Sequence, residues 1–247
     1  MKLTKLIPKR LKPILKRQPI VQKLESRLTR QVARERIIQF LEKHQTETLT
    51  LEVGAGTSPY KDFFPNRISG DVVADYKITE DIHIFYSSLN LRFDAHHLPF
   101  ANDSFLSVLC TEVLEHCTNP QQVVDELHRV LKPGGTLLLT TRFMFPLHEV
   151  PYDYFRFTKY GLQMLGRGFS HISVEEEETS LETLSILVHR LAKQSSWKFP
   201  PMQLFWRLIA QIMESSQTLL KQEYGDGSSI RQDTGIMSAG YHVVAKK

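Results

Sequence analysis

A predicted strand that ends in a glycine turn constrains this chain more than any other feature. Residues 48–53 (TLTLEV) predict a strand, and Gly54-Ala55-Gly56 follows directly. Glycine suits a position where the backbone turns sharply or lets a ligand approach, because glycine has no Cβ. A G-x-G turn also occurs in ordinary strand-to-helix connections. Other features of the sequence therefore have to decide between a binding site and a simple turn.

The second predicted strand supplies such a feature. Residues 70–76 predict a strand, and Asp75 near its end lies 19 residues after Gly56. In nucleotide-binding folds, an acid about 20 residues after the glycine turn accepts hydrogen bonds from ribose hydroxyls. The third glycine of the dinucleotide fingerprint is missing, because Pro59 stands at that position. The pattern therefore favours a nucleotide-like cofactor other than NAD.

Strands and helices alternate along the chain, which predicts a mostly parallel sheet with helices on both faces. Pro120 opens a predicted helix, since proline is favourable at a first helical position. The continuous apolar run at 136–141 predicts a central strand. The predicted elements are, in order, helix 31–44, strands 48–53, 70–76 and 105–110, a helix from 120, strands 136–141 and 171–174, helices near 180–194 and 201–222, and strand 241–245.

The charge is concentrated at one end. Residues 1–36 hold twelve basic and two acidic side chains, whereas the remainder holds 19 basic and 25 acidic ones. We expect a basic arm over 1–36 and one domain over 37–247, with a helical insert at about 180–224. The acidic body makes nucleic acid an unlikely partner. The arm, with its interspersed aliphatic residues, predicts a peripheral contact with an anionic membrane. A disordered or domain-packed arm is the alternative, because Pro8 and Pro13 interrupt a continuous helix.

Several classes of protein are excluded by what the sequence lacks. No run of about 18 apolar residues predicts a membrane-spanning helix. The two cysteines, Cys110 and Cys117, are too few for a disulfide framework or a four-ligand zinc site, and we expect a reducing, cytoplasmic location. We expect no metal, because His116 and Cys117 have no partners at ligand spacing. His96-His97 are interpreted as loop residues.

Four segments together resemble class I S-adenosylmethionine (SAM)-dependent methyltransferases of the type 11 group. The resemblance implies an α/β, Rossmann-like fold with a mostly parallel central sheet, a helical insert before the last strand, and SAM as the cofactor. The segments span residues 51–140 in the usual order, as LEVGAGTSPY (51–60), VVADY (72–76), FDAHHLPFANDSF (93–105), and EVLEH (112–116) with DELHRVLKPGGTLLLT (125–140).

The resemblance assigns cofactor contacts to particular residues. Glu126 and Arg129 match a pair of residues that recurs in this family, and their expected role is structural. The cofactor residues are expected to be Glu52 near the SAM amino group, Gly54 and Gly56 at the methionine moiety, Asp75 at the ribose hydroxyls, and Asp94 with the Ala95 backbone at the adenine.

The segment after the central strand is expected to face the methyl group. Residues 146–158 (PLHEVPYDYFRFT) resemble a segment of type 11 enzymes encoded alongside surface-glycan machinery. His148 is the best candidate for a general base, because an unperturbed imidazole titrates near neutral pH. The alternative is a hydrogen-bonded loop that shapes the pocket and contains no base. The other candidates on the acceptor side are Glu149, Tyr152, Asp153, Tyr154 and Arg156.

The expected function is transfer of the SAM methyl group to a small-molecule, glycan or lipid-linked acceptor. Two alternatives stay open. A nucleic-acid methyltransferase is supported only by the basic arm. A SAM-binding protein without catalysis would use the same cofactor residues.

Overall fold

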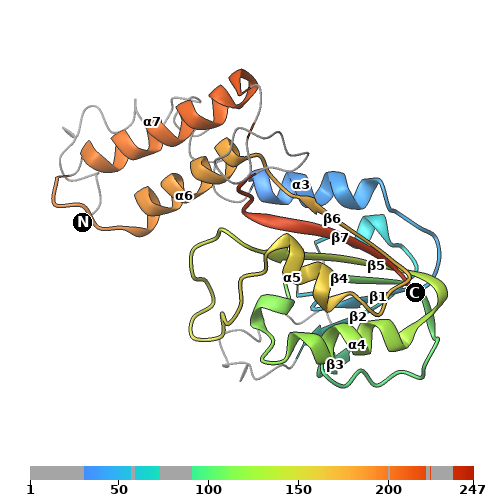
Figure 1. Ribbon diagram of the computed structural model, residues 1–247. Coiled ribbons are helices and arrows are strands. Elements are labelled where there is room, and N and C mark those ends of the chain that lie inside the picture. Colours follow the sequence, from blue (N-terminus) through green and yellow to red (C-terminus); the bar gives the residue numbers. More distant parts are fainter. Residues whose placement is uncertain (1–30, 57–58, 73–90, 200, 221–222, 224–235) are drawn as a thin grey trace. The chain divides into compact units, whose positions relative to one another are not determined.

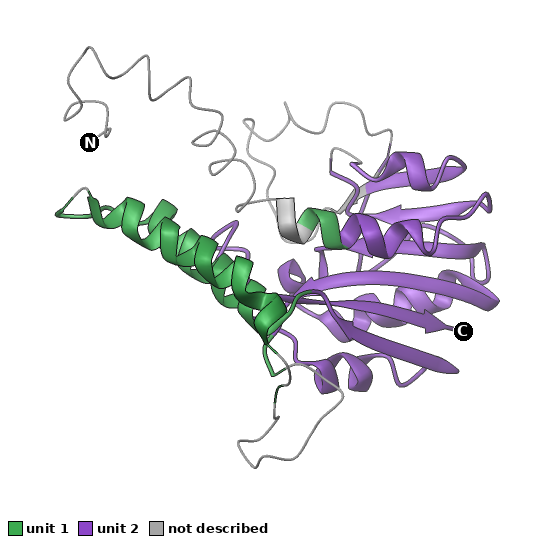
Figure 2. Ribbon diagram, turned by 90° about the horizontal axis from the view of Figure 1, so that it is seen from above, with its two compact units in different colours: residues 1–36, 178–237 green, residues 37–177, 238–247 purple. Residues whose placement is uncertain are grey.

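The computed structural model of the chain describes residues 31–56, 59–72, 91–199, 201–220, 223 and 236–247 (Figure 1). The chain divides into two compact units. The larger unit comprises residues 37–177 and 238–247, and the smaller comprises residues 1–36 and 178–237 (Figure 2).

The larger unit is built on a single sheet. In the described part of the chain, seven strands pair in the order β3-β2-β1-β4-β5-β7-β6. The strands from β3 to β5 are paired in parallel, and β7 runs antiparallel to both of its neighbours. The mostly parallel α/β sheet predicted from the sequence is therefore confirmed. The strands are β1 (Thr50–Val53), β2 (Arg67–Val72), β3 (Leu91–Phe93), β4 (Phe105–Thr111), β5 (Leu131–Arg142), β6 (His171–Glu176) and β7 (Gly240–Lys246).

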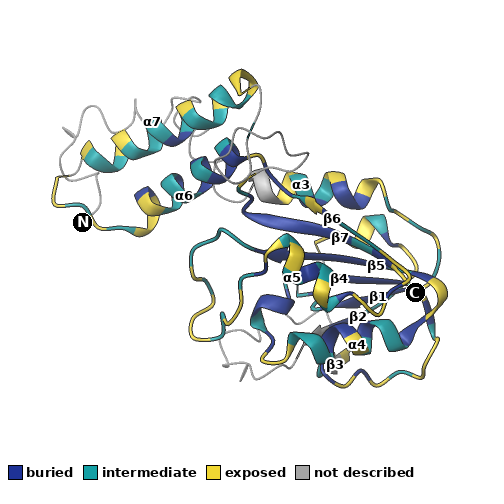
Figure 3. Cartoon of the chain, in the orientation of Figure 1, coloured by how far each residue is buried: buried dark blue, intermediate teal, exposed yellow. Residues whose placement is uncertain are grey.

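Helices cover both faces of this sheet (Figure 1). On one face, α4 (Pro120–Val130) and α5 (Lys159–Leu165) pack over apolar side chains of β1, β4 and β5. On the other face, α3 (Gln31–Glu42) places Ile37, Phe40 and Leu41 against Leu109 and Leu138. Successive residues of β5 therefore contribute to opposite cores, and the strand is buried along 137–142 (Figure 3). This double burial explains the continuous apolar run that predicted a central strand.

The predicted helix starting at Pro120 is confirmed. Asn119 caps it by accepting a hydrogen bond from the Gln122 backbone N–H at 3.3 Å. The other boundaries differ modestly from the predictions: β1 begins at Thr50, β2 already begins at Arg67, and α7 (Pro201–Ser216) ends before the predicted residue 222. The periodicity did not predict α5 or the three-residue strand β3, because elements this short give weak patterns.

The smaller unit contains two packed helices, α6 (Ser180–Gln194) and α7, followed by the 3-10 turn η4 (Gln217–Leu219). Thr179 and Glu182 form a capping box at the start of α6. Glu182 also binds Arg36, whose guanidinium lies 2.6 Å from its carboxylate. Within the described ranges, no helix is both long enough and apolar enough to cross a membrane.

His189 makes the stability of this helical pair depend on pH. Its side chain is buried on α6, and its Nδ1 has no hydrogen-bond partner among the described residues. Burial, with smaller contributions from the charges of Arg207 on α7 and of Lys193 and Arg190 on α6, lowers the pKa of His189 to about 4. Protonation at acid pH therefore opposes the folded state.

We predict that α6 loses protection as the pH falls through the range between 6.5, the ordinary value, and about 4. At pH 5 the loss should reach about 2 kcal/mol, because the unfolded imidazole binds a proton that the folded one excludes. Hydrogen exchange of residues 180–194, corrected for intrinsic rates, measures this loss. His189→Gln should show no such acid dependence, and equal protection of the wild-type helix at pH 5 and pH 7 would contradict the prediction.

Candidate functional site

The glycine turn lies at the carboxyl end of β1. Gly54 and Gly56 both have positive φ angles, of 72° and 51°, in the left-handed region that disfavours residues with a Cβ. The Gly54 and Ala55 backbone N–H groups both donate to the Gly70 carbonyl, at 3.0 and 3.1 Å, which ties the turn to β2. The strand order reverses between β1 and β4, and open α/β sheets bind ligands in the crevice outside such a reversal.

Glu52 is buried beneath this turn, with 2% of its surface exposed. Its carboxylate accepts a hydrogen bond from the Ser69 hydroxyl at 2.6 Å and lies 3.4 Å from Nε of Arg67. These partners lie on β2, so Glu52 links the first two strands next to the turn. Its predicted contact with the SAM amino group stays a prediction.

Asp94 follows β3 and organises a tight loop. Its carboxylate accepts hydrogen bonds from the His96 backbone N–H at 2.8 Å and from the His96 ring at 2.7 Å, and it lies 3.4 Å from the His97 ring. Burial raises the pKa of Asp94, but these hydrogen bonds outweigh burial and the net pKa lies below its ordinary value. Asp94 is therefore ionised at neutral pH and can accept a further hydrogen bond. The adjacent Ala95 is fully buried.

The predicted structural pair on α4 holds the same loop. Glu126 accepts a hydrogen bond from the Leu98 backbone N–H at 2.8 Å. Arg129 binds Glu126 and also donates to the carbonyls of Leu98 and Phe100, at 2.9 and 2.8 Å. The pair thus fixes the loop that carries Asp94. Asp75, the predicted ribose ligand, lies outside the described residues.

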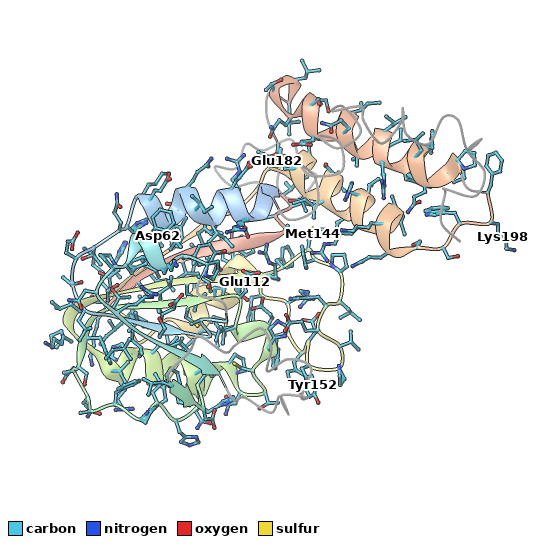
Figure 4. All side chains as sticks on the ribbon, turned by 180° about the vertical axis from the view of Figure 1, so that it is seen from behind. Asp62, Glu112, Met144, Tyr152, Glu182 and Lys198 are labelled. Carbon is cyan, nitrogen blue, oxygen red and sulfur yellow. The ribbon has the colours of Figure 1, made fainter. Side chains whose placement is uncertain are left out.

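A buried ionic network begins where β4 ends. Glu112, which Figure 4 labels, is the first residue after β4 and has a positive φ of 56°. Its carboxylate accepts hydrogen bonds from Thr140 at 2.9 Å and from the buried Arg142. Arg142 also donates to Glu177 at 2.9 Å. A positive charge is thereby fixed between two carboxylates at the carboxyl edge of the sheet. The sequence motif EVLEH contained Glu112, but nothing in it identified Arg142 as the partner.

Glu115 is the most deeply buried acid of this edge, with none of its surface exposed. Thr141 donates to its Oε2 at 2.8 Å, and Oε1 has no hydrogen-bond partner among the described residues. Burial, with a smaller contribution from the nearby charge of Glu112, raises the pKa of Glu115 to about 8. Nothing in the sequence indicated a function for this residue.

Hydrogen bonds hold the segment after β5 next to Glu115. The backbone N–H groups of Tyr154 and Phe155 both donate to the Glu115 carbonyl, at 2.8 and 3.2 Å. Nδ1 of His116 lies 2.7 Å from the carbonyl of Tyr152, which Figure 4 labels. These contacts bring the predicted acceptor segment to the end of β4, as its place after the central strand suggested.

His148 occupies the middle of this segment. Its ring lies edge-on to the His116 ring, with centroids 4.8 Å apart, and its Nδ1 lies 3.3 Å from Asp153. Burial lowers the pKa of His148, with smaller contributions from the charges of His116 and Arg156, while Asp153 opposes the shift. The imidazole is therefore neutral at pH 7 and has a basic nitrogen.

The other acceptor-side candidates differ in position. The side chain of Asp153 is buried and is bound by both terminal nitrogens of Arg156, so this pair supports the loop. Glu149 is largely exposed, 3.9 Å from Nε2 of His116. Tyr154 is exposed, and Tyr152 is partly buried. The structure thus brings His148, Asp153 and Arg156 together.

The family comparison agrees with this geometry. The family model described as a methyltransferase domain matches residues 51–139, which run from β1 through β5. A SAM-dependent methyltransferase from Thermotoga maritima superposes with a TM-score of 0.53 at 17% identity, covering 93% of this chain and 97% of that one. Residues 51–139 are therefore similar to a methyltransferase domain, and the sheet has the class I, Rossmann-like fold that the resemblance implied.

Curated relatives are similar over shorter stretches. A thiol S-methyltransferase from Rattus norvegicus is 29% identical over 109 residues, which cover 40% of this chain and 45% of the relative. A ubiquinone/menaquinone biosynthesis C-methyltransferase from Blochmanniella pennsylvanica is 35% identical over 85 residues, or 33% of each chain. The chain thus spans less than half the length of these relatives.

The glycine turn gives a direct prediction. Gly56→Val should abolish SAM binding, because a β-branched side chain disfavours the positive φ of the turn that is expected to face the cofactor. Titration calorimetry measures the binding, and circular dichroism should stay near native. Gly168→Val is the matched control, because a Cβ there meets no atom within 4 Å. If Gly56→Val bound SAM with an affinity within about tenfold of wild type, the cofactor would have to bind elsewhere.

The ionic network gives a second prediction. Arg142→Met should lower the free energy of unfolding by about 3–5 kcal/mol, because it leaves Glu112 and the buried Glu177 without their cation. Arg167→Met, at an exposed position, should change it by less than about 0.5 kcal/mol. Denaturant unfolding at pH 7 measures both variants, and equal stability of the two would show that the network contributes little.

Proposed function

We propose that this chain transfers the methyl group of SAM to a small-molecule, glycan or lipid-linked acceptor. The observation that carries the proposal is the glycine turn with two positive φ angles at the strand reversal, within a segment that matches a methyltransferase domain. Proteins of this class generally use SAM. Small acceptors are favoured because the relatives named above include thiol and quinone-pathway methyltransferases.

The proposed arrangement divides the carboxyl edge of the sheet into two halves. Gly54, Gly56 and Asp94 would hold the cofactor over β1 and β3, with Asp75 at the ribose. The segment 146–158 would hold the acceptor over β4 and β5. The acceptor nucleophile attacks the methyl carbon, the bond from that carbon to the sulfonium breaks with its electron pair on sulfur, and S-adenosylhomocysteine leaves.

Methyl transfer of this kind depends mainly on alignment and exclusion of water. The hydrogen bonds from Tyr154 and Phe155 to Glu115 support such positioning, because they fix the loop to the sheet edge. For an acceptor with a bound proton, the neutral His148 is suited to remove it, and Asp153 would stabilise the resulting imidazolium.

The test is to combine calorimetry with product analysis. The full chain should bind SAM, and metabolite extracts should yield S-adenosylhomocysteine together with an acceptor that is one methyl group heavier by mass spectrometry. Comparing metabolites and glycolipids between wild-type and deletion strains then names the acceptor. Binding without turnover across many extracts would favour a SAM-binding protein without catalysis, and absence of binding would overturn the proposal.

Asp75 provides the residue-level prediction. A carboxylate that accepts two ribose hydroxyls makes charged hydrogen bonds worth about 1.5–3 kcal/mol, so Asp75→Ala should weaken SAM binding roughly 10- to 150-fold. Asp62→Ala is the matched control, because Asp62 is an exposed acid on the 3-10 turn η2 (Lys61–Phe63). Unchanged affinity in folded Asp75→Ala would remove this residue from the site.

A further inference from the structure

We propose that Glu115, His116 and His148 form a binding site for a divalent first-row transition metal ion such as Zn²⁺. One ligand atom from each residue lies within 4.8 Å of the other two. The sequence predicted no metal site, because His116 has no partner at ligand spacing. The fold supplies that partner from the segment after β5, 32 residues further along the chain.

The first argument is the orientation of His116. Its Nδ1 lies 2.7 Å from the Tyr152 carbonyl, which can only accept a hydrogen bond. Nδ1 therefore carries the proton, and the lone pair of the neutral ring is on Nε2. Metal-bound histidines typically donate their second nitrogen to a carbonyl or carboxylate in this way, because the donation fixes the tautomer and the ring orientation.

The second argument is that a carboxylate, that of Asp153, lies next to the ring of His148. Its Nδ1 lies 3.3 Å from the Asp153 carboxylate, and its backbone N–H donates to the same oxygen at 2.9 Å. Asp153 is itself buried and held by Arg156. Nδ1 also lies 3.5 Å from Nη2 of Arg156, which can only donate, so these contacts alone do not fix which ring nitrogen carries the proton. Metal binding through Nε2 requires the tautomer with the proton on Nδ1, facing the Asp153 carboxylate.

The third argument is the carboxylate of Glu115. It is fully buried, and Thr141 satisfies only Oε2. Oε1 has no hydrogen-bond partner among the described residues, although buried polar atoms are rarely left without one. A cation between Oε1 and the two imidazoles would satisfy this oxygen.

The ligand set limits the identity of the ion. Two imidazoles and one carboxylate suit Zn²⁺ and other first-row divalent ions, whereas Ca²⁺ and Mg²⁺ prefer oxygen ligands alone. Two ligand atoms of a tetrahedral Zn²⁺ are separated by about 3.4 Å. The widest pair therefore has to close by at most about 1.4 Å, which a side-chain rotation can provide.

Three protein ligands leave a coordination position open, as in catalytic rather than structural zinc sites. If the proposed methyl transfer holds, the acceptor's hydroxyl or thiol would bind there and lose its proton to solvent. The oxygen or sulfur anion would then attack the methyl carbon of SAM. With the metal bound, His148 would act as a ligand in place of the base, and its replacement would weaken metal binding as well as lower turnover.

The test is titration of Zn²⁺ into chelator-treated full-length protein, without SAM. We expect one ion per chain, and a visible absorption spectrum when Co²⁺ replaces Zn²⁺. Glu115→Gln, His116→Gln and His148→Gln should each weaken Zn²⁺ binding at least about tenfold, and Asp153→Asn should weaken it about 10- to 100-fold. His171→Gln is the matched control, because His171 is exposed on β6.

The two proposals can fail separately. Absence of stoichiometric Zn²⁺ binding in a protein that binds SAM would overturn the metal site alone. An equal loss of binding in His171→Gln and in the three ligand variants would overturn it too, since it would indicate adventitious surface binding. Zn²⁺ bound by these three ligands in a protein that does not bind SAM would support the metal site and contradict methyl transfer. Thermal unfolding identifies any variant that fails to fold. Where a ligand variant does not fold, the Co²⁺ spectrum of the wild-type protein shows instead whether nitrogen ligands are bound.

Discussion

The site depends on the parallel pairing of β1 with β4. Their register runs from Thr50 opposite Ser107 to Val53 opposite Cys110, so the two strands end side by side. The chain leaves β1 through the glycine turn and leaves β4 through Glu112, and both residues that follow the strands have positive φ. The turns that follow β1 and β4 therefore lie side by side at the carboxyl edge of the sheet. The other residues of the candidate site are positioned around these two turns.

Charged side chains at this edge form ion pairs. Glu112 and Glu177 share Arg142, and Asp153 is paired with Arg156. Glu115 is fully buried near Glu112, and its pKa is raised to about 8. A buried carboxyl without a full set of partners is costly, so its presence indicates a functional demand at this position. Both a sulfonium cofactor and a metal ion would provide positive charge here.

Much of the fold could be predicted from the sequence because its signals are local. The strand with Gly54 and Gly56, the helix at Pro120 and the apolar run of β5 each follow from a few adjacent residues. The pairing of Glu126 with Arg129 was likewise visible, since three residues separate them on one helix. Short elements such as β3 and α5 lacked enough periodicity to be predicted.

The centre of the candidate site could not be predicted because its contacts are long-range. Arg142 meets Glu112 and Glu177 from different elements, and His148 meets His116 only after β5 has returned the chain to the same edge. The ordinary pKa of an imidazole and the place of its segment after the central strand identified His148 as a base candidate, but nothing in the sequence indicated a function for Glu115. The orphaned oxygen of Glu115 becomes apparent only when burial and hydrogen bonding are known together.

The central claim is that the carboxyl edge of β1 and β4 holds the cofactor next to the segment 146–158. A crystal structure of the full chain with S-adenosylhomocysteine tests it most directly. The account predicts the methionine moiety against Gly54 and Gly56, the adenine near Asp94, and the sulfur facing His148. Ligand density at any other surface, or a sulfur turned away from the segment 146–158, would contradict it.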